Sequence, residues 1–244
     1  MNQIEGRNAV LEALKTGRPV DKIFIRKGEY TGTLRLIAAK AREAGAVISE
    51  ADIRKLDEMA QSHNHQGVIA ICPAKEYAEV PDILNLAEEK GEQPFIIILD
   101  GVTDTYNLGA VIRTADACGA HGVIIPKRRS ATLTGMVGKA SAGAAEHVLV
   151  ARVPNIVNTI ESLKRQNIWI VCADTGGDDL YETDVSGAAA VVIGGEGAGV
   201  GRLIKEKSDH IVKIPMYGSI PSLNSSVAAA VIMYEIVRRR RVKA

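Results

Sequence analysis

The stretch that decides the fold runs from Phe95 to Pro126 and reads FIIILDGVTDTYNLGAVIRTADACGAHGVIIP. It begins with a run of apolar residues, continues through a helical pattern that closes at Gly119, and ends in a second apolar run. Uninterrupted apolar strands that alternate with helices are typical of a parallel sheet covered on both faces. The stretch therefore predicts an α/β unit built on a parallel sheet.

The same rhythm continues to the C-terminus. Apolar strands are expected at 147–153, 168–174, 188–195 and 210–216, and the long helical pattern at 222–241 follows the last of them. In open parallel sheets, ligands bind in the crevice beyond the carboxyl ends of the strands. The loops that follow these strands are therefore the places where a functional site is expected.

A smaller α/β pattern precedes this part of the chain. Helices are predicted at 6–17, 33–47 and 49–61, and strands at 21–28 and 67–73. Ser49 and Asp52 form a near capping box at the start of the third helix. An acidic segment then separates two mildly basic blocks. The predicted division is a domain at 1–75, an acidic linker region at 76–92 and a second domain at 93–244.

Composition excludes several classes of protein. The chain has 244 residues, 46% hydrophobic and 24% charged, which argues against disordered, collagen-like and coiled-coil proteins. Its apolar stretches are too short for a bilayer span and its N-terminus lacks a signal pattern, so a cytosolic protein with no membrane partner is expected. Three cysteines without C-x-x-C spacing argue against a disulfide scaffold and a cysteine-rich zinc site. The net charge of +1 permits polyanion binding without deciding it.

Familiar phosphate and metal motifs do not fit. GGEGAGVG lacks the spacing of a dinucleotide-binding loop, and LTGMVGKAS has Ala140 where a Walker A loop needs Ser or Thr. The pair His63 and His65 lies in a polar stretch and is interpreted as a solvated turn in preference to a metal site. The sequence predicts no metal centre.

Three loops after predicted strands are unusual. The first places Asn107 at the start of a helix and Arg113 six residues later, the second leaves Glu196 among glycines, and the third carries Ser222 and Asn224 ahead of a helix of small residues. Taken singly, each has an ordinary structural explanation: a helix cap with a solvated arginine, a flexible turn, and a closely packed helix.

Taken together and in this order, the motifs N-x5-R, G-G-E-G-x-G and I-P-M-x-G-S-x-x-S-L-N-x-S-x-A resemble those of the SpoU/TrmH-type RNA ribose 2′-O-methyltransferases of the SPOUT superfamily. The resemblance spans residues 97–238. Residues 1–75 resemble the small α/β RNA-binding domain of the L30e type that several members carry. Within the family, the layout is most similar to the RlmB-like enzymes, which methylate a guanosine of 23S ribosomal RNA.

The resemblance implies features that periodicity alone does not. It implies a deep trefoil knot in the C-terminal domain, S-adenosylmethionine bound in that knot, and a homodimer whose active sites are completed across the interface. The implied cofactor contacts are Gly194, Gly195, Glu196, Ile214, Met216 and Leu223.

The resemblance also implies roles in catalysis. The family assigns the 2′-hydroxyl proton to the motif-one arginine, here Arg113, but a guanidinium is effectively never deprotonated in proteins. Arg113 is therefore expected to bind phosphate and stabilise the developing alkoxide. Asn107 is expected to hold Arg113 and the ribose, Glu196 to orient the guanidinium, and Ser222 and Asn224 to contact the nucleotide or each other.

RNA binding is expected to use residues outside these motifs, most of them basic. Asn8 and the loop 63–66 are expected to contribute RNA contacts beside the basic residues. The expected basic contacts are Arg7, Arg26, Lys27, Lys127, Arg128 and Arg129.

Three functional interpretations stay open at this point. The first is a methyltransferase acting on a guanosine of 23S ribosomal RNA, and the second is a transfer-RNA guanosine 2′-O-methyltransferase, against which the full N-terminal domain argues. The third is a non-catalytic RNA-binding factor of ribosome assembly, which would have no chemical need for the intact polar set.

Overall fold

The computed structural model describes residues 2–62 and 64–243. The chain divides into two compact units, Met1–Glu76 with Thr132–His147, and Tyr77–Ala131 with Val148–Ala244. The segment Thr132–His147 thus packs with the N-terminal unit, although the division by sequence counts it with residues 93–244. Within the described residues, no helix has both the length and the apolar character needed to cross a bilayer.

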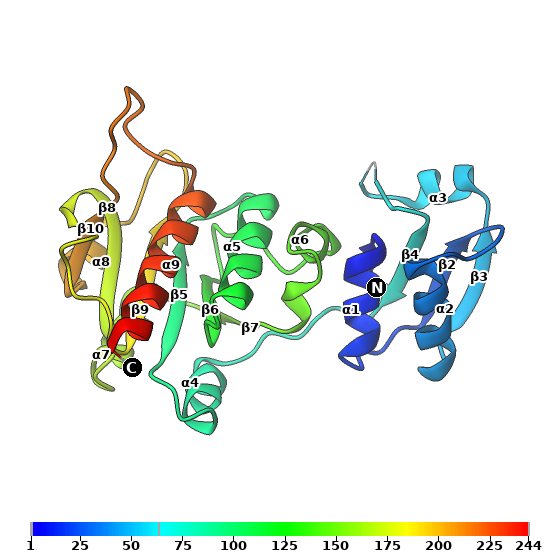
Figure 1. Ribbon diagram of the computed structural model, residues 1–244, viewed down its shortest axis with the longest axis horizontal. Helices are drawn as coiled ribbons and strands as arrows, with labels where there is room; N and C mark the ends of the chain where they lie inside the picture. Colours follow the sequence, from blue (N-terminus) through cyan, green and yellow to red (C-terminus); the bar gives the residue numbers. More distant parts are fainter. Residues whose placement is uncertain (1, 63, 244) are drawn as a thin grey trace. The chain divides into compact units, whose positions relative to one another are not determined.

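The N-terminal unit is built on a four-stranded sheet of order β1-β4-β2-β3 (Figure 1). Only β2 and β3 pair in parallel, while β4 runs antiparallel to both of its neighbours. Apolar residues of α1 and α2 form its core with the strands. The strands are β1 (Asn2–Glu5), β2 (Lys22–Arg26), β3 (Val47–Ala51) and β4 (Val68–Cys72), and the helices are α1 (Arg7–Lys15), α2 (Thr33–Glu43) and α3 (Ile53–Met59).

One predicted helix of this unit begins later than expected. Residues 49–51 belong to β3, which pairs in register with β2, and helix α3 begins only at Ile53. The side chain of Asp52 caps it by accepting a hydrogen bond from the Lys55 amide at 2.9 Å. The predicted start at Ser49 is wrong because pairing with a distant strand overrides the local capping pattern.

The segment Thr132–His147 completes the N-terminal unit with helix α6 (Gly135–Ala140) and the 3-10 turn η1 (Ala144–Glu146). A Cβ at Gly135 would lie 1.7 Å from the carbonyl oxygen of Gln3, so β1 and α6 meet backbone to backbone. The ammonium of Lys139 donates to the Ser62 hydroxyl at 2.6 Å, and Glu146, whose side chain is 6% exposed, pairs with Arg18 at 2.6 Å. The residues that resemble a Walker A loop therefore have a structural role.

The C-terminal unit holds a six-stranded sheet of order β10-β8-β9-β5-β6-β7, in which every strand pair is parallel. The α/β class with a parallel sheet, predicted from the apolar runs, is confirmed; the knot stays a prediction. The strands are β5 (Phe95–Asp100), β6 (Gly122–Pro126), β7 (Leu149–Val153), β8 (Trp169–Asp179), β9 (Ala189–Gly194) and β10 (His210–Lys213). The helices are α4 (Val80–Glu89), α5 (Thr105–Ala117), α7 (Ile156–Lys164), α8 (Arg202–Lys207) and α9 (Ser225–Lys243).

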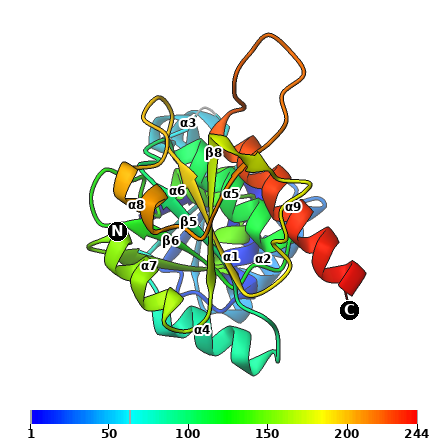
Figure 2. The same cartoon turned by 90° about the vertical axis from the view of Figure 1, so that its left-hand side faces the viewer.

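Helices cover both faces of this sheet. Helices α4, α7 and α8 bury their apolar side chains against one face, where Ile96 and Ile98 of β5 contribute to the core. Helices α5 and α9 pack together on the opposite side (Figure 2). Because both faces are buried, β5 needs an unbroken apolar run. The acidic segment 76–92 contains α4, whose Ile83 is fully buried in this core.

The basic run at the end of α9 is used inside the unit. Glu235, 6% exposed, accepts hydrogen bonds from Arg238 and Arg239. Arg240 donates to the carbonyl oxygens of Pro94 and Gly187 and lies 4.9 Å from the centre of the Phe95 ring. These arginines therefore fix the end of α9 to the rest of the unit.

We expect Glu235→Gln to lower the free energy of unfolding by about 1–2 kcal/mol near neutral pH. Hydrogen bonds from Arg238, and secondarily from Arg239, hold the pKa of Glu235 below its ordinary value. A depressed folded-state pKa gives stability that is present above the unfolded-state pKa and lost as the pH falls through the folded-state pKa. The difference in urea unfolding between the variant and the wild type should therefore shrink as the pH falls below the ordinary pKa of a glutamate. Equal stability near neutral pH would contradict this role, and Glu206→Gln, at an exposed pair with Arg202, is the control.

Candidate active site

Three loops meet at the edge of the C-terminal sheet where its parallel strands end. The loop after β5 leads into α5, the loop after β9 carries the glycines, and the segment after β10 leads into α9 (Figure 1). Strands β5 and β9 are hydrogen-bonded neighbours, with Asp100 paired with Gly194 at their ends. The parallel sheet thus brings together loops that lie far apart in the sequence.

Side chains from the three loops form one polar cluster. The amide of Asn107 donates to Glu196 Oε1 at 3.0 Å, and the amide of Asn224 donates to the same oxygen at 3.0 Å. Asn224 Nδ2 also lies 3.0 Å from Asn107 Oδ1. The Asn224 Oδ1 atom caps α9 by accepting from the amides of Ser226 and Val227. One residue of each motif therefore belongs to a single network.

The glycines after β9 let the backbone of this loop pack against other backbone. The Gly195 amide donates to the Asp100 carbonyl at 2.7 Å, and the Gly201 amide donates to the Asp100 carboxylate at 2.8 Å. A Cβ at Gly195 would lie 2.1 Å from the carbonyl oxygen of Gly101, and one at Gly194 would lie 2.2 Å from the carbonyl carbon of Gly199. Glycine is required at both positions because no side chain fits.

Strand β8 contributes a bulge to the same edge. Cys172 pairs with Ile211 of β10, but the next residue of β10, Val212, pairs with Asp178. The five residues 173–177 of β8 are therefore looped out of the ladder. This bulge brings Ala173, Asp174 and Thr175 beside the segment that follows β10.

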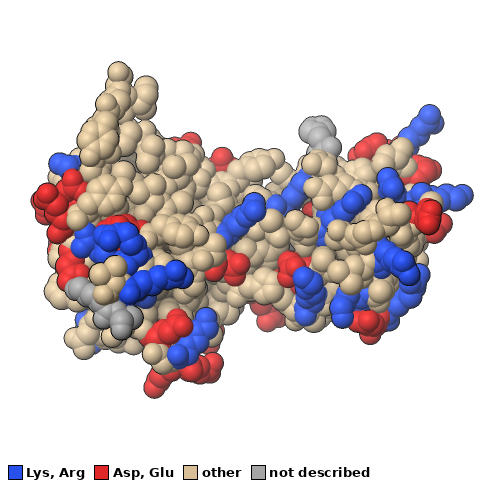
Figure 3. Space-filling model, in the orientation of Figure 1, with Lys and Arg blue, Asp and Glu red and all other residues tan. Residues whose placement is uncertain are grey.

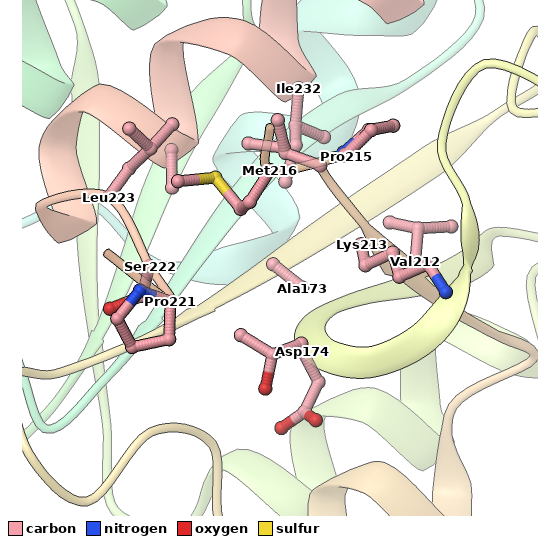
Figure 4. A pocket seen from close by; sticks show the side chains of 13 residues that line it. Ala173, Asp174, Val212, Lys213, Pro215, Met216, Pro221, Ser222, Leu223 and Ile232 are labelled. Atoms are coloured by element: carbon pink, nitrogen blue, oxygen red, sulfur yellow. The ribbon is translucent and has the colours of Figure 1, made fainter. Parts of the chain in front are cut away.

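Two adjoining hollows lie among these loops. The first, of about 340 Å³, has an apolar wall that includes Met216, Leu223 and Ile232, with Asp174 on the opposite side (Figure 4). The second, of about 540 Å³, is lined by Gly194–Gly197, by Glu196 and by Asn224. The hollows share the residues Ala173, Asp174, Thr175, Ser222, Leu223 and Ala228. The structure thus places around them all the residues expected to contact a cofactor: Gly194, Gly195, Glu196, Ile214, Met216 and Leu223.

Asp174 and Thr175 line both hollows, although the sequence motifs do not include them. A hydrogen bond from Lys205, and then one from the Gly176 amide, hold the pKa of Asp174 below its ordinary value, so the site contains a carboxylate that is ionised at neutral pH. The available signal was an Asp-Thr-Gly-Gly sequence directly after an apolar strand. Polar residues at that position lie at the ligand-binding edge of a parallel sheet.

The structure does not bring Arg113 into the polar cluster of its own chain. Arg113 is exposed on α5 and forms no hydrogen bond or ion pair with any other described residue. Six residues correspond to about 240° of rotation in a helix, so Arg113 projects from a different side of α5 than buried Asn107. Ser222, by contrast, lines both hollows.

The expected RNA contacts fall into two groups, one in each unit. Arg7 and Arg26 line one hollow of the N-terminal unit, and Lys27 is exposed next to Arg26. The loop 127–129 is exposed after β6, and its continuation is tied to the loop after β5 by a hydrogen bond from the Ala131 amide to the Val102 carbonyl at 2.9 Å.

The structure corrects the expectation of a solvated turn at His65. His65 is buried, with Nε2 3.0 Å from Asp57 and Nδ1 accepting from the Gly67 amide at 3.0 Å, so it is not the solvated residue that was expected. His63 lies outside the described residues. In residues 2–62 and 64–243, no group of three or more His, Cys, Asp or Glu side chains could hold a metal ion.

Comparison with known proteins agrees with this geometry. The model of the SpoU rRNA methylase family matches residues 94–234, and that of RNA 2′-O ribose methyltransferase substrate binding matches residues 3–78. YacO of Bacillus subtilis, a TrmH-family tRNA/rRNA methyltransferase by name, is 47% identical over 236 residues, which cover 96% of this chain and 94% of that protein.

Two solved structures are similar over nearly the whole chain. The SpoU methyltransferase AviRb from Streptomyces viridochromogenes, in complex with the cofactor AdoMet, has a TM-score of 0.80 and 26% identity, and the match covers 99% of this chain and 91% of that one. An RNA 2′-O ribose methyltransferase has a TM-score of 0.80 and 25% identity, covering 98% and 88%. Three motif loops that converge on one network, two matching family models and a relative of nearly the same length lead to one conclusion: the chain belongs to the SpoU family of RNA methyltransferases.

Proposed function

We propose that this protein transfers a methyl group from S-adenosylmethionine to the ribose 2′-hydroxyl of a guanosine in 23S ribosomal RNA, as a cytoplasmic homodimer that takes part in ribosomal RNA processing. The observation that carries the proposal is the network of Asn107, Glu196 and Asn224 beside the two adjoining hollows. The full N-terminal unit, which matches a substrate-binding family, favours ribosomal over transfer RNA.

The first hollow suits the parts of S-adenosylmethionine. Its apolar wall of Met216, Leu223 and Ile232 can receive an adenine ring, and Asp174 offers an anionic acceptor to the hydroxyl or ammonium groups of the cofactor. The backbone of Gly194, Gly195 and Gly197 borders the second hollow with no side chains of its own. When bound, the cofactor supplies an activated methyl group on its sulfonium.

The chain's own task is to position the ribose oxygen and manage its charge. Alignment of reacting groups can supply about 7–11 kcal/mol of a barrier. We assign Asn107 and Asn224 to the ribose and the nucleotide, Glu196 to fixing both amides, and Ser222 to the nucleotide. We assign Arg113 to binding phosphate and stabilising the developing alkoxide, since a guanidinium offers a fixed fork of N–H donors.

The place of Arg113 supports the dimer. Since this guanidinium is exposed on α5 and outside the network of its own chain, we infer that it serves the site of a second copy. Tyr234 of α9, the helix that packs with α5, is 53% exposed, and exposed apolar side chains of this kind suit an interface between copies.

We expect Asn224→Asp to lower methyl transfer about 100-fold with little change in stability. Aspartate caps a helix as well as asparagine, but its carboxylate would replace the amide that donates to Glu196. The matched control is Asn155→Asp, because Asn155 caps α7 outside the site. Single-turnover rates and thermal unfolding of both variants test this, and an active Asn224→Asp enzyme would remove the network from catalysis.

Incubation with labelled S-adenosylmethionine and separated RNAs tests the function itself. Label in a ribose of large-subunit RNA is expected. Label in transfer RNA would favour the second candidate, and RNA binding without label would favour an assembly factor. Mapping the modified ribose in cells with and without the protein identifies the nucleotide.

A further inference from the structure

A further hollow lies in the N-terminal unit, apart from the two hollows of the candidate active site. It measures about 610 Å³ and opens where β1 and β2 end and helices α1 and α2 begin. The described residues that line it include two arginines, three side-chain amides and no carboxylate. They are Arg7, Asn8, Arg26, Thr33, Ile53, Asn64, His65, Gln66 and Gly67.

The guanidinium of Arg26 is available to a ligand. It forms no hydrogen bond or ion pair with any residue that the structure describes. Its stem lies against Gly67, where a Cβ would come within 3.0 Å of Arg26 Cδ. The glycine therefore gives the arginine room to lie flat along the loop at the rim of the hollow.

Unpaired backbone amides add to the positive charge of the two arginines at this hollow. Glycines occupy the N-cap positions of α1 and α2, so neither helix is capped by the side chain of its own N-cap residue. The amides of Asn8 and Thr33, both on residues that line the hollow, donate to no described residue. Free amides in the first turn of a helix favour an anion.

The opposite wall is held in a defined conformation. The Nδ1 atom of buried His65 accepts from the Gly67 amide, so the ring proton is on Nε2 and is donated to Asp57. Gln66 has a positive φ of 54° and bonds to Arg7 twice: its side chain accepts from the Arg7 amide at 2.9 Å and its carbonyl from Arg7 Nε at 3.1 Å. The hollow is therefore preorganised.

We propose that this hollow takes one unpaired nucleotide of the RNA substrate. Its phosphate lies against Arg26 and the amides of Asn8 and Thr33, and its base meets the side-chain amides of Asn64 and Gln66. Several lysines and arginines around the N-terminal unit give adjacent phosphates further partners (Figure 3). The hollow exceeds what a lone phosphate needs, and RNA is read mostly through unstacked bases. The inference rests on the proposed RNA substrate.

The test compares Arg26→Glu with Arg42→Glu in the full chain. Arg42 is exposed in the last turn of α2, about 13 Å along the helix from Thr33, so it changes the same charge away from the hollow. The probe is a short fluorescent oligoribonucleotide, unpaired or annealed to its complement, titrated at several salt concentrations. We expect Arg26→Glu to weaken binding of the unpaired probe about ten-fold or more, and Arg42→Glu less than about two-fold.

Several outcomes would overturn the proposal. Equal losses of affinity in Arg26→Glu and Arg42→Glu would indicate that the overall positive charge of the unit attracts RNA, without a specific site. Unchanged affinity in both variants would show that the hollow does not bind RNA. Equal weakening of unpaired and duplex probes would exclude an inserted nucleotide, and displacement of the probe by millimolar guanosine monophosphate would indicate a site for free nucleotides. If Arg26→Glu unfolds the unit, Arg26→Gln replaces it in the test, because glutamine removes the positive charge without adding a negative one. Arg26→Gln should weaken binding of the unpaired probe by a smaller factor, and unchanged binding would overturn the proposal. The binding assay does not depend on methyl transfer. A wild-type chain that binds the unpaired probe but methylates no RNA would therefore contradict the proposed function and leave the proposed nucleotide site supported.

Discussion

The variant Arg113→Lys is expected to transfer methyl groups at least about 100-fold more slowly than the wild type, with unchanged affinity for S-adenosylmethionine. Lysine keeps the charge but lacks the planar fork of five N–H donors that can hold a phosphate and a ribose oxygen together. Because Arg113 is exposed and unpaired among the described residues of its own chain, the substitution should leave thermal unfolding unchanged. Single-turnover rates and calorimetric titration of the cofactor measure the two quantities separately.

Arg165→Lys is the matched control, since Arg165 is an exposed arginine at the end of α7. It should keep the wild-type rate. Turnover close to wild type in Arg113→Lys would refute the assignment of Arg113 to the transition state. Mixed dimers of Arg113→Lys and Asn224→Asp chains add a further check, because one intact site per dimer should restore part of the activity if Arg113 acts across the interface.

The variant Gly195→Ala is expected to lose most of its affinity for S-adenosylmethionine and about 1–3 kcal/mol of stability. The added methyl would lie 2.1 Å from the carbonyl oxygen of Gly101, and neither backbone segment can move without breaking the bond from the Gly195 amide to Asp100. The loop that borders the second hollow must then shift. Calorimetric titration with the cofactor and thermal unfolding measure the two losses.

Gly138→Ala separates this effect from a general sensitivity to glycine replacement. Gly138 lies in helix α6 with open space around its Cα, so alanine there should be neutral or stabilise by up to about 1 kcal/mol. Wild-type cofactor binding by Gly195→Ala would show that the close backbone approach has no role in the pocket.

The parallel sheet could be predicted because its signal is local. The run Phe95–Asp100 is apolar at every position before its last, which a strand buried on both faces requires. Strand β1, four residues at the start of the chain, and helix α8, six residues long, gave no such signal and were missed. Residues 49–51 of strand β3 fall within the predicted helix 49–61, because the pairing of β3 with β2 leaves no signal in the local pattern.

The site could be predicted only as far as its motifs reached. Asn107, Glu196 and Asn224 were identified as a set by resemblance, and the structure joins them through hydrogen bonds. The bulge that presents Asp174 depends on the register between β8 and β10, which is a tertiary property. The side of α5 from which Arg113 projects was calculable from the helical repeat, but the helical repeat does not indicate what its guanidinium binds.

The docking of Thr132–His147 on the N-terminal unit has a consequence for protein engineering. A fragment that stops at Glu76 would uncover the edge of β1 against which Gly135 lies and would leave Arg18 without Glu146. Such a truncation should be poorly soluble, whereas a graft of 132–147 through a short tether should rescue it. A chimera that exchanges RNA-binding modules between relatives must therefore exchange this insertion as well.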